Sequence, residues 1–355
     1  MTRAQTTSTT QQNTAGPIPP NPAGKNVLLN SSFDIWQRGT SIARTGSGGT
    51  SSDYTADRWV IGGSGGTSTT TSRQSTNDST NLPHIQYCAR VQRTASNSDT
   101  STIYFAQVFE SINSIPLAGK TVTLSFYARK GADYSASGSG LGASFGGGTG
   151  TDQSLFAFTG ATTAIGFTPT LTTTWQRFSA TGTVSSTATQ LRLYFSFSPT
   201  GTAGANDYFE ITGVQIEVSS SATPFNRNSG TIQGELAACQ RYYYKETPDN
   251  QYAGFGIGIL YSTTAGYVLW RLPVQMRTQP TLSVSSTASH YQTYTGGAGG
   301  LATCSAAPSS QGFSKIGCFV YFAFTSPGAG NAAGQAFQGT SDSTFNGYLA
   351  ASAEL

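Results

Sequence analysis

The side chains that catalysis uses are few and scattered in this chain. It has 16 acidic residues and two histidines, His84 and His290. Cleavage of a polysaccharide needs two carboxylates at a fixed separation, whereas Asp133, Asp152 and Asp207 stand alone in sequence typical of turns. Two histidines are also too few for a histidine-rich metal site, and they make a Ser/His/Asp triad improbable. The sequence therefore predicts a non-enzymatic protein with no catalytic site, no metal site and no cofactor.

Thiol chemistry is the next candidate. The four cysteines are Cys88, Cys239, Cys304 and Cys318, and none forms a CxxC pair. An unpaired cysteine usually packs as a small hydrophobic side chain, so we expect buried free thiols. A disulfide between Cys304 and Cys318 stays open as an alternative, because spacing alone does not decide it.

Aromatic side chains in Gly-rich sequence are candidates for sugar binding. Tyr134, Phe145, Tyr291 and Tyr294 lie in such stretches, where we expect exposure. Ring faces bordered by hydroxyl groups suit stacking and hydrogen bonding to saccharides. The alternative is that each ring folds back over its own loop.

Composition and charge narrow the class of protein. Charged residues make up 10% of the chain and aromatic residues 12%, with 42 glycines and a net charge of +3. Aromatic and hydroxyl-rich strands joined by glycine turns are typical of all-β proteins. Without a basic run we expect no nucleic-acid binding. Without an apolar stretch of about 20 residues we expect no membrane insertion, and without a hydrophobic signal region we expect assembly in a cytoplasm.

The elements that position these residues form four segments. Residues 1–24 are Pro-rich and lack apolar periodicity, which predicts an extended arm. Residues 25–228 predict a jelly-roll β-sandwich, because several runs alternate apolar and polar side chains with period two. The predicted strands are 26–33, 56–61, 87–93, 103–111, 121–130, 155–159, 175–183, 190–196 and 208–217, with loops at 62–81 and 131–150.

The third and fourth segments are a helix and a second domain. Residues 229–248 predict a connecting α-helix capped by Thr231 and stopped by Pro248. Its apolar stripe is Ile232, Leu236, Cys239 and Tyr243. This stripe is expected either to plug one end of the sandwich or to pack around a symmetry axis. Residues 249–355 predict a smaller C-terminal β-sandwich, with strands at 255–261, 266–272, 281–285, 291–294, 314–323 and 344–354.

Several passages together resemble those of a known family. They are Asn26–Asn30 with Phe33–Thr40, Tyr54–Trp59, Ile211–Glu217 with Ala222–Phe225, Gly234–Leu236 with Cys239–Tyr243, Arg271–Pro280, and Ala353–Leu355. In this order they resemble passages of tail-fibre and virion appendage proteins of tailed bacteriophages. The first domain of that family resembles the jelly-roll fold of carbohydrate-binding modules.

The resemblance implies a function and partners. It implies a virion structural protein, foremost a tail-fibre or receptor-binding component that contacts host surface glycans. A decoration protein that stabilises the capsid or tail is the alternative, and a polysaccharide depolymerase is the second alternative. Residues 1–24 are then expected to attach to other virion proteins, and the chain is expected to form a homo-oligomer, a trimer by resemblance.

Overall fold

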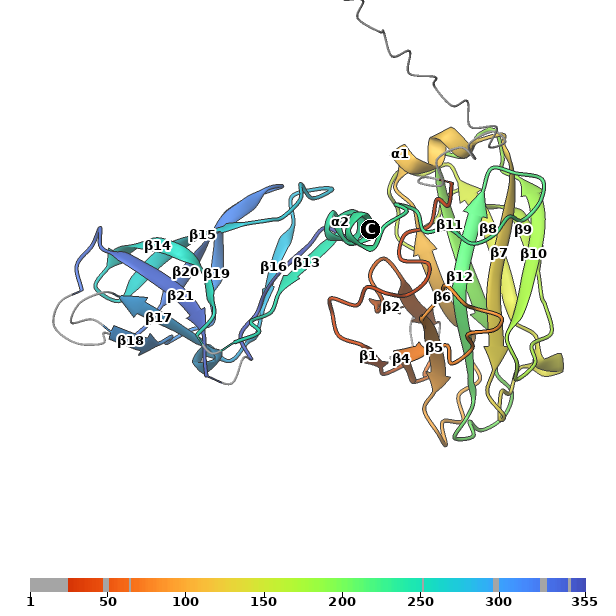
Figure 1. Ribbon diagram of the computed structural model, residues 1–355, viewed down its shortest axis with the longest axis horizontal. Helices are drawn as coiled ribbons and strands as arrows, with labels where there is room; N and C mark the ends of the chain where they lie inside the picture. Colours follow the sequence, from red (N-terminus) through yellow and green to blue (C-terminus); the bar gives the residue numbers. More distant parts are fainter. Residues whose placement is uncertain are drawn as a thin grey trace, which may run out of the picture.

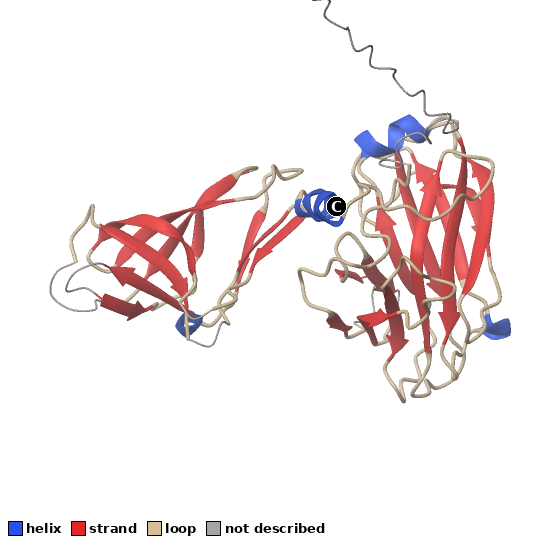
Figure 2. Cartoon of the chain, in the orientation of Figure 1, coloured by secondary structure: helices blue, strands red, loops and turns tan. Residues whose placement is uncertain are grey.

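The protein is all-β, as the sequence predicts. The computed structural model describes residues 25–46, 51–63, 65–250, 252–295, 300–325, 331–343 and 346–355, so the predicted arm at 1–24 lies outside the described residues. The described strands form four sheets, with short helical segments between them (Figures 1 and 2). Two six-stranded sheets build a jelly-roll domain, and a seven-stranded and a three-stranded sheet build a second, smaller domain.

The jelly-roll domain holds one apolar core between its two sheets. The first sheet runs β1 (Ser41–Arg44), β4 (Thr69–Ser75), β5 (Tyr87–Arg93), β12 (Tyr208–Glu217), β7 (Thr121–Lys130) and β10 (Gln176–Thr183). The second runs β2 (Ser51–Tyr54), β3 (Val60–Gly63), β6 (Ile103–Val108), β11 (Gln190–Phe197), β8 (Gly142–Gly148) and β9 (Thr162–Phe167). Short helices α1 (Ser111–Ser114), η1 (Ile115–Leu117) and η2 (Ser137–Ser139) lie in its connections.

The predicted alternation positions the core. Leu191, Leu193 and Phe195 of β11 point inward and are fully buried. Phe126 of β7 meets Phe195 edge to face, with ring centroids 4.9 Å apart. Side chains of a strand point alternately to opposite faces, so Arg192 and Tyr194 are left on the outer face of the second sheet.

Two predicted strands of this domain are turns. In residues 26–33, Asn30 and Phe33 have φ of 50° and 56°, which no strand adopts. The Asn30 side chain replaces strand pairing there, because its amide donates to Ile35 O (2.7 Å) and its oxygen accepts from Ile35 N (3.0 Å). Residues 155–159 form a loop over the second sheet instead of a strand, with Leu155 buried against Val60, Ala106 and Val108.

Conversely, two predicted loops contain strands. Residues 62–81 include β4, whose Thr69 and Thr71 are buried, and residues 131–150 include β8. Strand β8 is Gly-rich because its neighbour comes very close: a Cβ at Gly146 would lie 2.0 Å from Thr162 O. Strands built from threonine and glycine lack the apolar alternation that marks the others.

The connecting helix differs from its prediction in its buried face. Helix α2 (Ile232–Gln240) is capped as predicted, since Thr231 Oγ1 accepts from Gly234 N at 3.1 Å. It ends before Tyr243, however, so Pro248 plays no part in stopping it. Ile232 and Leu236 are exposed, and the buried side chains are Cys239 and Glu235. Glu235 turns inward because its carboxylate accepts from the backbone N–H groups of Asn30 (2.5 Å) and Ser229 (3.1 Å).

The second domain packs its two sheets around a separate core. The three-stranded sheet runs β13 (Tyr243–Glu246), β22 (Leu349–Ser352) and β16 (Thr281–Val284). The seven-stranded sheet runs β18 (Gly300–Thr303), β17 (Tyr291–Thr295), β21 (Ala336–Ser341), β14 (Gly254–Ser262), β15 (Ala265–Arg271), β20 (Gly317–Ala323) and β19 (Ser309–Ser314), and η3 (Ala288–His290) precedes β17. Because β13 pairs with β22, residues before 249 already belong to this domain.

The cysteines are buried and free. All four thiols are unpaired, and Cys304 and Cys318 both belong to the core of the second domain. The expectation of buried free thiols is therefore confirmed, and the alternative disulfide is not formed.

Candidate functional site

Three of the four aromatic residues predicted to face solvent are core residues. Phe145 is fully buried in β8, and Tyr134 stacks on Phe197 with ring centroids 4.4 Å apart. The Tyr134 hydroxyl donates to Gly140 O at 2.9 Å, which satisfies its polar end inside the domain. The expectation of exposure is wrong for Tyr134 and Phe145, because glycine-rich sequence here builds strands and tight turns instead of open loops.

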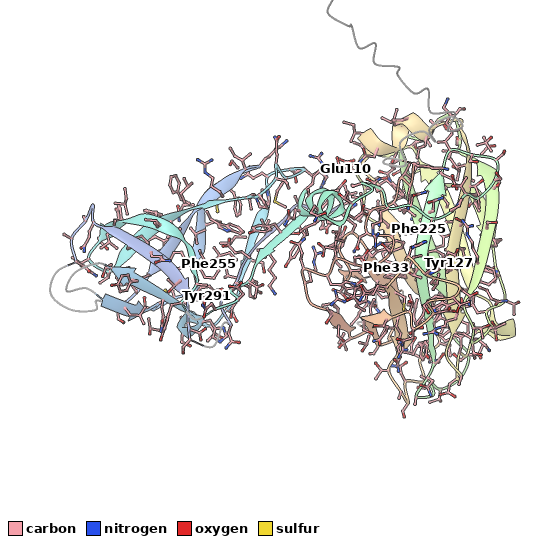
Figure 3. All side chains as sticks on the ribbon, in the orientation of Figure 1. Phe33, Glu110, Tyr127, Phe225, Phe255 and Tyr291 are labelled. Carbon is pink, nitrogen blue, oxygen red and sulfur yellow. The ribbon has the colours of Figure 1, made fainter. Side chains whose placement is uncertain are left out.

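In the second domain Tyr291 is buried and Tyr294 is exposed. Tyr291 lies beside Phe255 in the core, with ring centroids 6.0 Å apart (Figure 3). Its hydroxyl donates to Tyr348 O at 2.7 Å and accepts from Ser285 N at 2.8 Å. Both residues lie in β17, and their spacing of three places them on opposite faces. Tyr294 is 52% exposed and is the one predicted ring that the fold leaves available.

Several of the motif passages of the sequence converge where the two domains meet. We call this cluster the joint. It consists of Gln37, Arg38, Asp57, Arg58, Glu110, Arg241, Tyr242, Tyr243, Arg277 and Glu354. Figure 1 shows the C-terminus beside α2, between the two domains. The residues of the joint come from separate loops and strand ends. Together they form one contact surface between the two domains.

The Glu354 carboxylate lies at the centre of the joint. It pairs with the Arg58 guanidinium and with Arg38 Nη2 (3.1 Å). Arg58 is 3% exposed. It also donates to Val108 O (2.7 Å) and stacks on Tyr242, with Cζ 3.6 Å from the ring centroid. Burial by itself lowers the pKa of Arg58, but the surrounding acidic groups, Glu354 foremost, together raise that pKa above its ordinary value, so the guanidinium stays charged.

A second layer of contacts holds the chain end and the helix. Arg277 Nε and Nη2 donate to Ala353 O and Glu354 O, each at 2.9 Å, and its Nη1 pairs with Asp152 at 3.1 Å. Asp152 belongs to the first domain and Arg277 to the second, so one guanidinium bridges both. Two parallel bonds of an arginine with its acceptors fix orientation as well as distance.

Helix α2 is anchored in the same way. Arg241 donates through Nε and Nη2 to the two Glu110 oxygens, each at 3.1 Å. Figure 3 shows Glu110 next to the end of the helix. Arg38 stacks on Tyr243, with Cζ 3.5 Å from the ring centroid. The sequence predicts Tyr243 on the apolar stripe of the helix, whereas this residue lies in β13 and makes a cation–π contact with Arg38.

Asp57 gives the joint a pH dependence. Its oxygens accept from Gln37 N (3.0 Å) and from the Gln37 side-chain amide, which also donates to Tyr243 O (2.7 Å). Burial raises the pKa of Asp57 to about 6, against the opposite effect of Gln37 and Arg38. The unfolded value is about 4. Because the folded protein holds the Asp57 proton more tightly than the unfolded chain, protonation of Asp57 stabilises the fold. This stabilisation is complete below about pH 4 and is lost as the pH rises through about 6.

We expect the protein to gain about 1 kcal/mol from Asp57 between about pH 7.5 and pH 5. Urea unfolding of the wild type and of Asp57→Asn at both pH values measures it, and the variant should show a smaller gain. Asp78→Asn, in an exposed loop, is the control and should keep the wild-type difference. Equal pH differences in the wild type and Asp57→Asn would contradict the assignment.

Two further buried carboxylates, Asp207 and Glu210, are paired with arginines. Asp207 is fully buried against Arg93 (2.7 Å), and Glu210 is held between Arg90 (2.6 Å) and Arg129 (2.5 Å). Asp207 is thus an ion-pair partner and not the solvated turn residue that the sequence predicts. Within the part of the chain that the structure describes, no three His, Cys, Asp or Glu side chains group as metal ligands.

An aromatic row lies on the outer face of the second sheet of the jelly roll. It consists of Tyr104 (β6), Tyr194 (β11) and Phe156, the last from the loop over that sheet. Tyr104 meets both neighbours edge to face, with ring centroids 5.7 Å from Tyr194 and 5.9 Å from Phe156. Arg192 fixes the loop by donating to Leu155 O and lies over the Phe158 ring at 4.4 Å.

Hydroxyl groups border the aromatic row. Ser196 is the pairing partner of Tyr104, and Ser144 is that of Tyr194. Beyond the strand ends, the Thr102 and Ser198 hydroxyls lie 3.0 Å apart. Partly exposed rings next to hydroxyl groups offer both ring faces and hydrogen bonds to a polar ligand. The alternation of apolar and polar side chains in β11 predicts that Tyr194 faces outward. The sequence does not show that β6 pairs with β11, which brings Tyr104 beside it.

No described helix is both long and apolar enough to cross a membrane.

Comparison with known proteins gives distant structural matches only. No protein-family model and no curated protein matches the chain. Tailspike protein 4 of bacteriophage CBA120, in its enzymatically active domain, matches at 13% identity over 55% of this chain and 22% of that one, with a TM-score of 0.33. The tandem CBM22 modules of Paenibacillus barcinonensis Xyn10C match at 10% identity over 94% of this chain and 98% of theirs, with a TM-score of 0.30. A CBM4 module matches at 19% identity over 54% of this chain and 98% of its own, with a TM-score of 0.30. At these scores no function passes from those proteins to this chain.

Proposed function

We propose that this chain is a non-enzymatic structural protein of a phage virion, a tail-fibre or receptor-binding component that contacts host surface glycans. The observation that carries the glycan contact is the aromatic row on the jelly roll, Tyr104, Tyr194 and Phe156. The row is uncharged, partly exposed and bordered by hydroxyl groups, which suits the apolar faces and the hydroxyls of sugar rings.

The joint supports a mechanical role. A protein that transmits contact from a particle to a cell surface needs domains that keep a fixed relative orientation. Here Arg58, Arg241 and Arg277 each connect groups far apart in the chain through charge-assisted bonds. Such bonds are directional and about twice as strong as neutral ones. Several of the passages that resemble phage appendage proteins contribute residues to this joint, among them Arg58, Arg241 and Glu354.

Glycan binding is measured with the purified full chain and a panel of purified bacterial surface polysaccharides. Tyr194→Ala and Tyr104→Ala should each raise Kd about tenfold, a loss of about 1.4 kcal/mol, because a stacking ring is removed from an otherwise intact face. The control is Tyr87→Ala, a tyrosine on the opposite sheet under Arg73, which should bind as the wild type does.

Tyr294→Ala tests the second domain in the same assay. Unchanged binding by this variant, with loss in Tyr194→Ala, places the contact on the jelly roll. The proposal fails if no polysaccharide binds, or if both row variants bind like the wild type. Release of reducing ends from a polysaccharide would instead support the depolymerase alternative.

A further inference from the structure

Large apolar side chains on one face of the seven-stranded sheet of the second domain are left exposed by the residues that the structure describes. We call this face the distal face. Its large apolar side chains are between 41% and 75% exposed. They are Ile257, Ile259 and Tyr261 of β14, Leu269 of β15, Phe319 of β20, Tyr294 of β17 and Leu301 of β18. Figure 1 shows β13 and β16 between this sheet and α2, so the open face lies on the far side from the joint.

Strand register makes these side chains contiguous. Leu301 pairs with Tyr294, Tyr294 with Gln338, and Gln338 with Ile257, across β18, β17, β21 and β14. A second row pairs Ile259 with Tyr267, and Tyr267 with Tyr321, across β14, β15 and β20. Paired side chains lie about 5 Å apart on one face. A shallow hollow of about 400 Å³ opens between the two rows, beside Leu269 and Phe319.

The core of the second domain does not need the apolar side chains of the distal face. The opposite side of the same strands already supplies the core, with Val268, Trp270 and Phe322 at most 1% exposed. Taking about 200 Å² for a large side chain, the exposed fractions of the seven residues amount to roughly 780 Å². The largest apolar patch of a typical monomer is about 300–600 Å², whereas one side of a standard interface is about 800 Å².

Charge decides which partner fits. The seven strands of the sheet contain one residue charged at neutral pH, Arg271 at the end of β15. Nucleic acids and anionic membranes need clusters of basic residues. A glycan could use Gln338 and the tyrosine hydroxyls of the rows, but the aliphatic side chains Ile257, Ile259, Leu269 and Leu301 offer it no hydrogen bond. An uncharged apolar face is complementary to itself, since two copies meet without repulsion and bury their exposed side chains.

We propose that the distal face packs against the distal face of another copy of this chain. The proposal places the self-association surface on the second domain, whereas packing of α2 around a symmetry axis was one of the two alternatives from the sequence. It goes beyond glycan binding and does not depend on it. The copies would present several jelly rolls at fixed positions around one axis, and each joint would hold its aromatic row at the outside of the assembly.

The test is the molar mass of the purified full chain by sedimentation equilibrium. The wild type should form a discrete oligomer, and its mass distinguishes a dimer from the trimer that the family resemblance implies. Ile257→Lys should weaken self-association at least about 100-fold, because like charges at the centre of an interface cost several kcal/mol. Ile232→Lys on α2 and Ile112→Lys on α1 are matched controls at exposed isoleucines and should leave the mass unchanged.

A second measurement guards against a variant that fails to fold. A photo-crosslinking residue in place of Tyr261 should join chains through peptides of β14, β15 or β20 in both copies. A monomeric wild type at about 50 μM would overturn the proposal, as would dissociation by Ile232→Lys and not by Ile257→Lys. Soluble oligosaccharide should bind Ile257→Lys as tightly per chain as the wild type, so failure here and failure of glycan binding are separate results.

Discussion

Arg58→Met should lower the free energy of unfolding by roughly 3–5 kcal/mol, the cost of breaking a buried ion pair from one side. Methionine fills a similar volume but leaves the Glu354 carboxylate buried with Arg38 as its remaining cation. It also removes the donor to Val108 O and the stacking on Tyr242. Urea unfolding followed by tryptophan fluorescence measures the loss, and limited proteolysis of the segment that links the domains should become faster.

The partner residue supplies the control for this prediction. In a Glu354→Gln background the same Arg58→Met substitution should cost clearly less, because the buried carboxylate that loses its Arg58 partner is then absent. A double-mutant cycle isolates that coupling, which we expect to be at least about 1 kcal/mol for residues in direct contact. Arg73→Met, which removes a cation–π contact with Tyr87 on the surface, should have a small effect. Equal losses for Arg58→Met in both backgrounds would show that the ion pair does not hold the domains.

Arg93→Met should have an effect of similar size, roughly 3–5 kcal/mol, confined to the jelly roll. Arg93 and Asp207 are both fully buried, and Arg93 Nη1 lies 2.7 Å from the carboxylate. Its Nη2 also donates to three backbone carbonyls, those of Asn97 (3.0 Å), Asp99 (2.8 Å) and Gly201 (3.1 Å). One guanidinium therefore closes two loops over the end of β5. Its loss leaves the Asp207 carboxylate buried without a cation, with Ser135 as its remaining hydrogen-bond donor.

Arg90→Met provides the matched comparison. Arg90 is three residues away in the same strand and pairs with Glu210, but Glu210 keeps Arg129 at 2.5 Å when Arg90 is removed. The cost should be about 1 kcal/mol. Chemical denaturation with a probe in each domain measures both variants. If Arg93→Met unfolds at the same urea concentration as Arg90→Met, or if the second domain is destabilised equally, the assignment of Arg93 is wrong.

The sequence predicted strands best where apolar side chains alternate. The bounds of β5, β7 and β12 agree with their predicted ranges, because one face of each strand enters the core and the pattern records that. Strand β4 and strand β8 were missed, since threonine and glycine strands carry no such pattern. The predicted exposure of Tyr134, Phe145 and Tyr291 was also wrong. A glycine-rich segment has the same composition whether it forms an open loop or a tightly paired strand.

The joint shows why sites of this kind are not visible in sequence. Each motif passage could be identified, but Arg58 and Glu354 lie 296 positions apart. Nothing in the spacing of residues along the chain states which arginine meets which carboxylate. The same holds for the distal face, where neighbours in one row come from four strands whose order in the sheet differs from their order in sequence.

The sequence by itself determined the β-class of the protein, most of its strands, the cap of its helix and the burial of its thiols. These features depend on the period of side chains along one segment, on local backbone preferences and on composition. Only the tertiary structure decided which rings are exposed, which face of α2 is buried and which charges pair. Those outcomes depend on strand pairing and domain packing, which bring distant residues together and remove particular side chains from water.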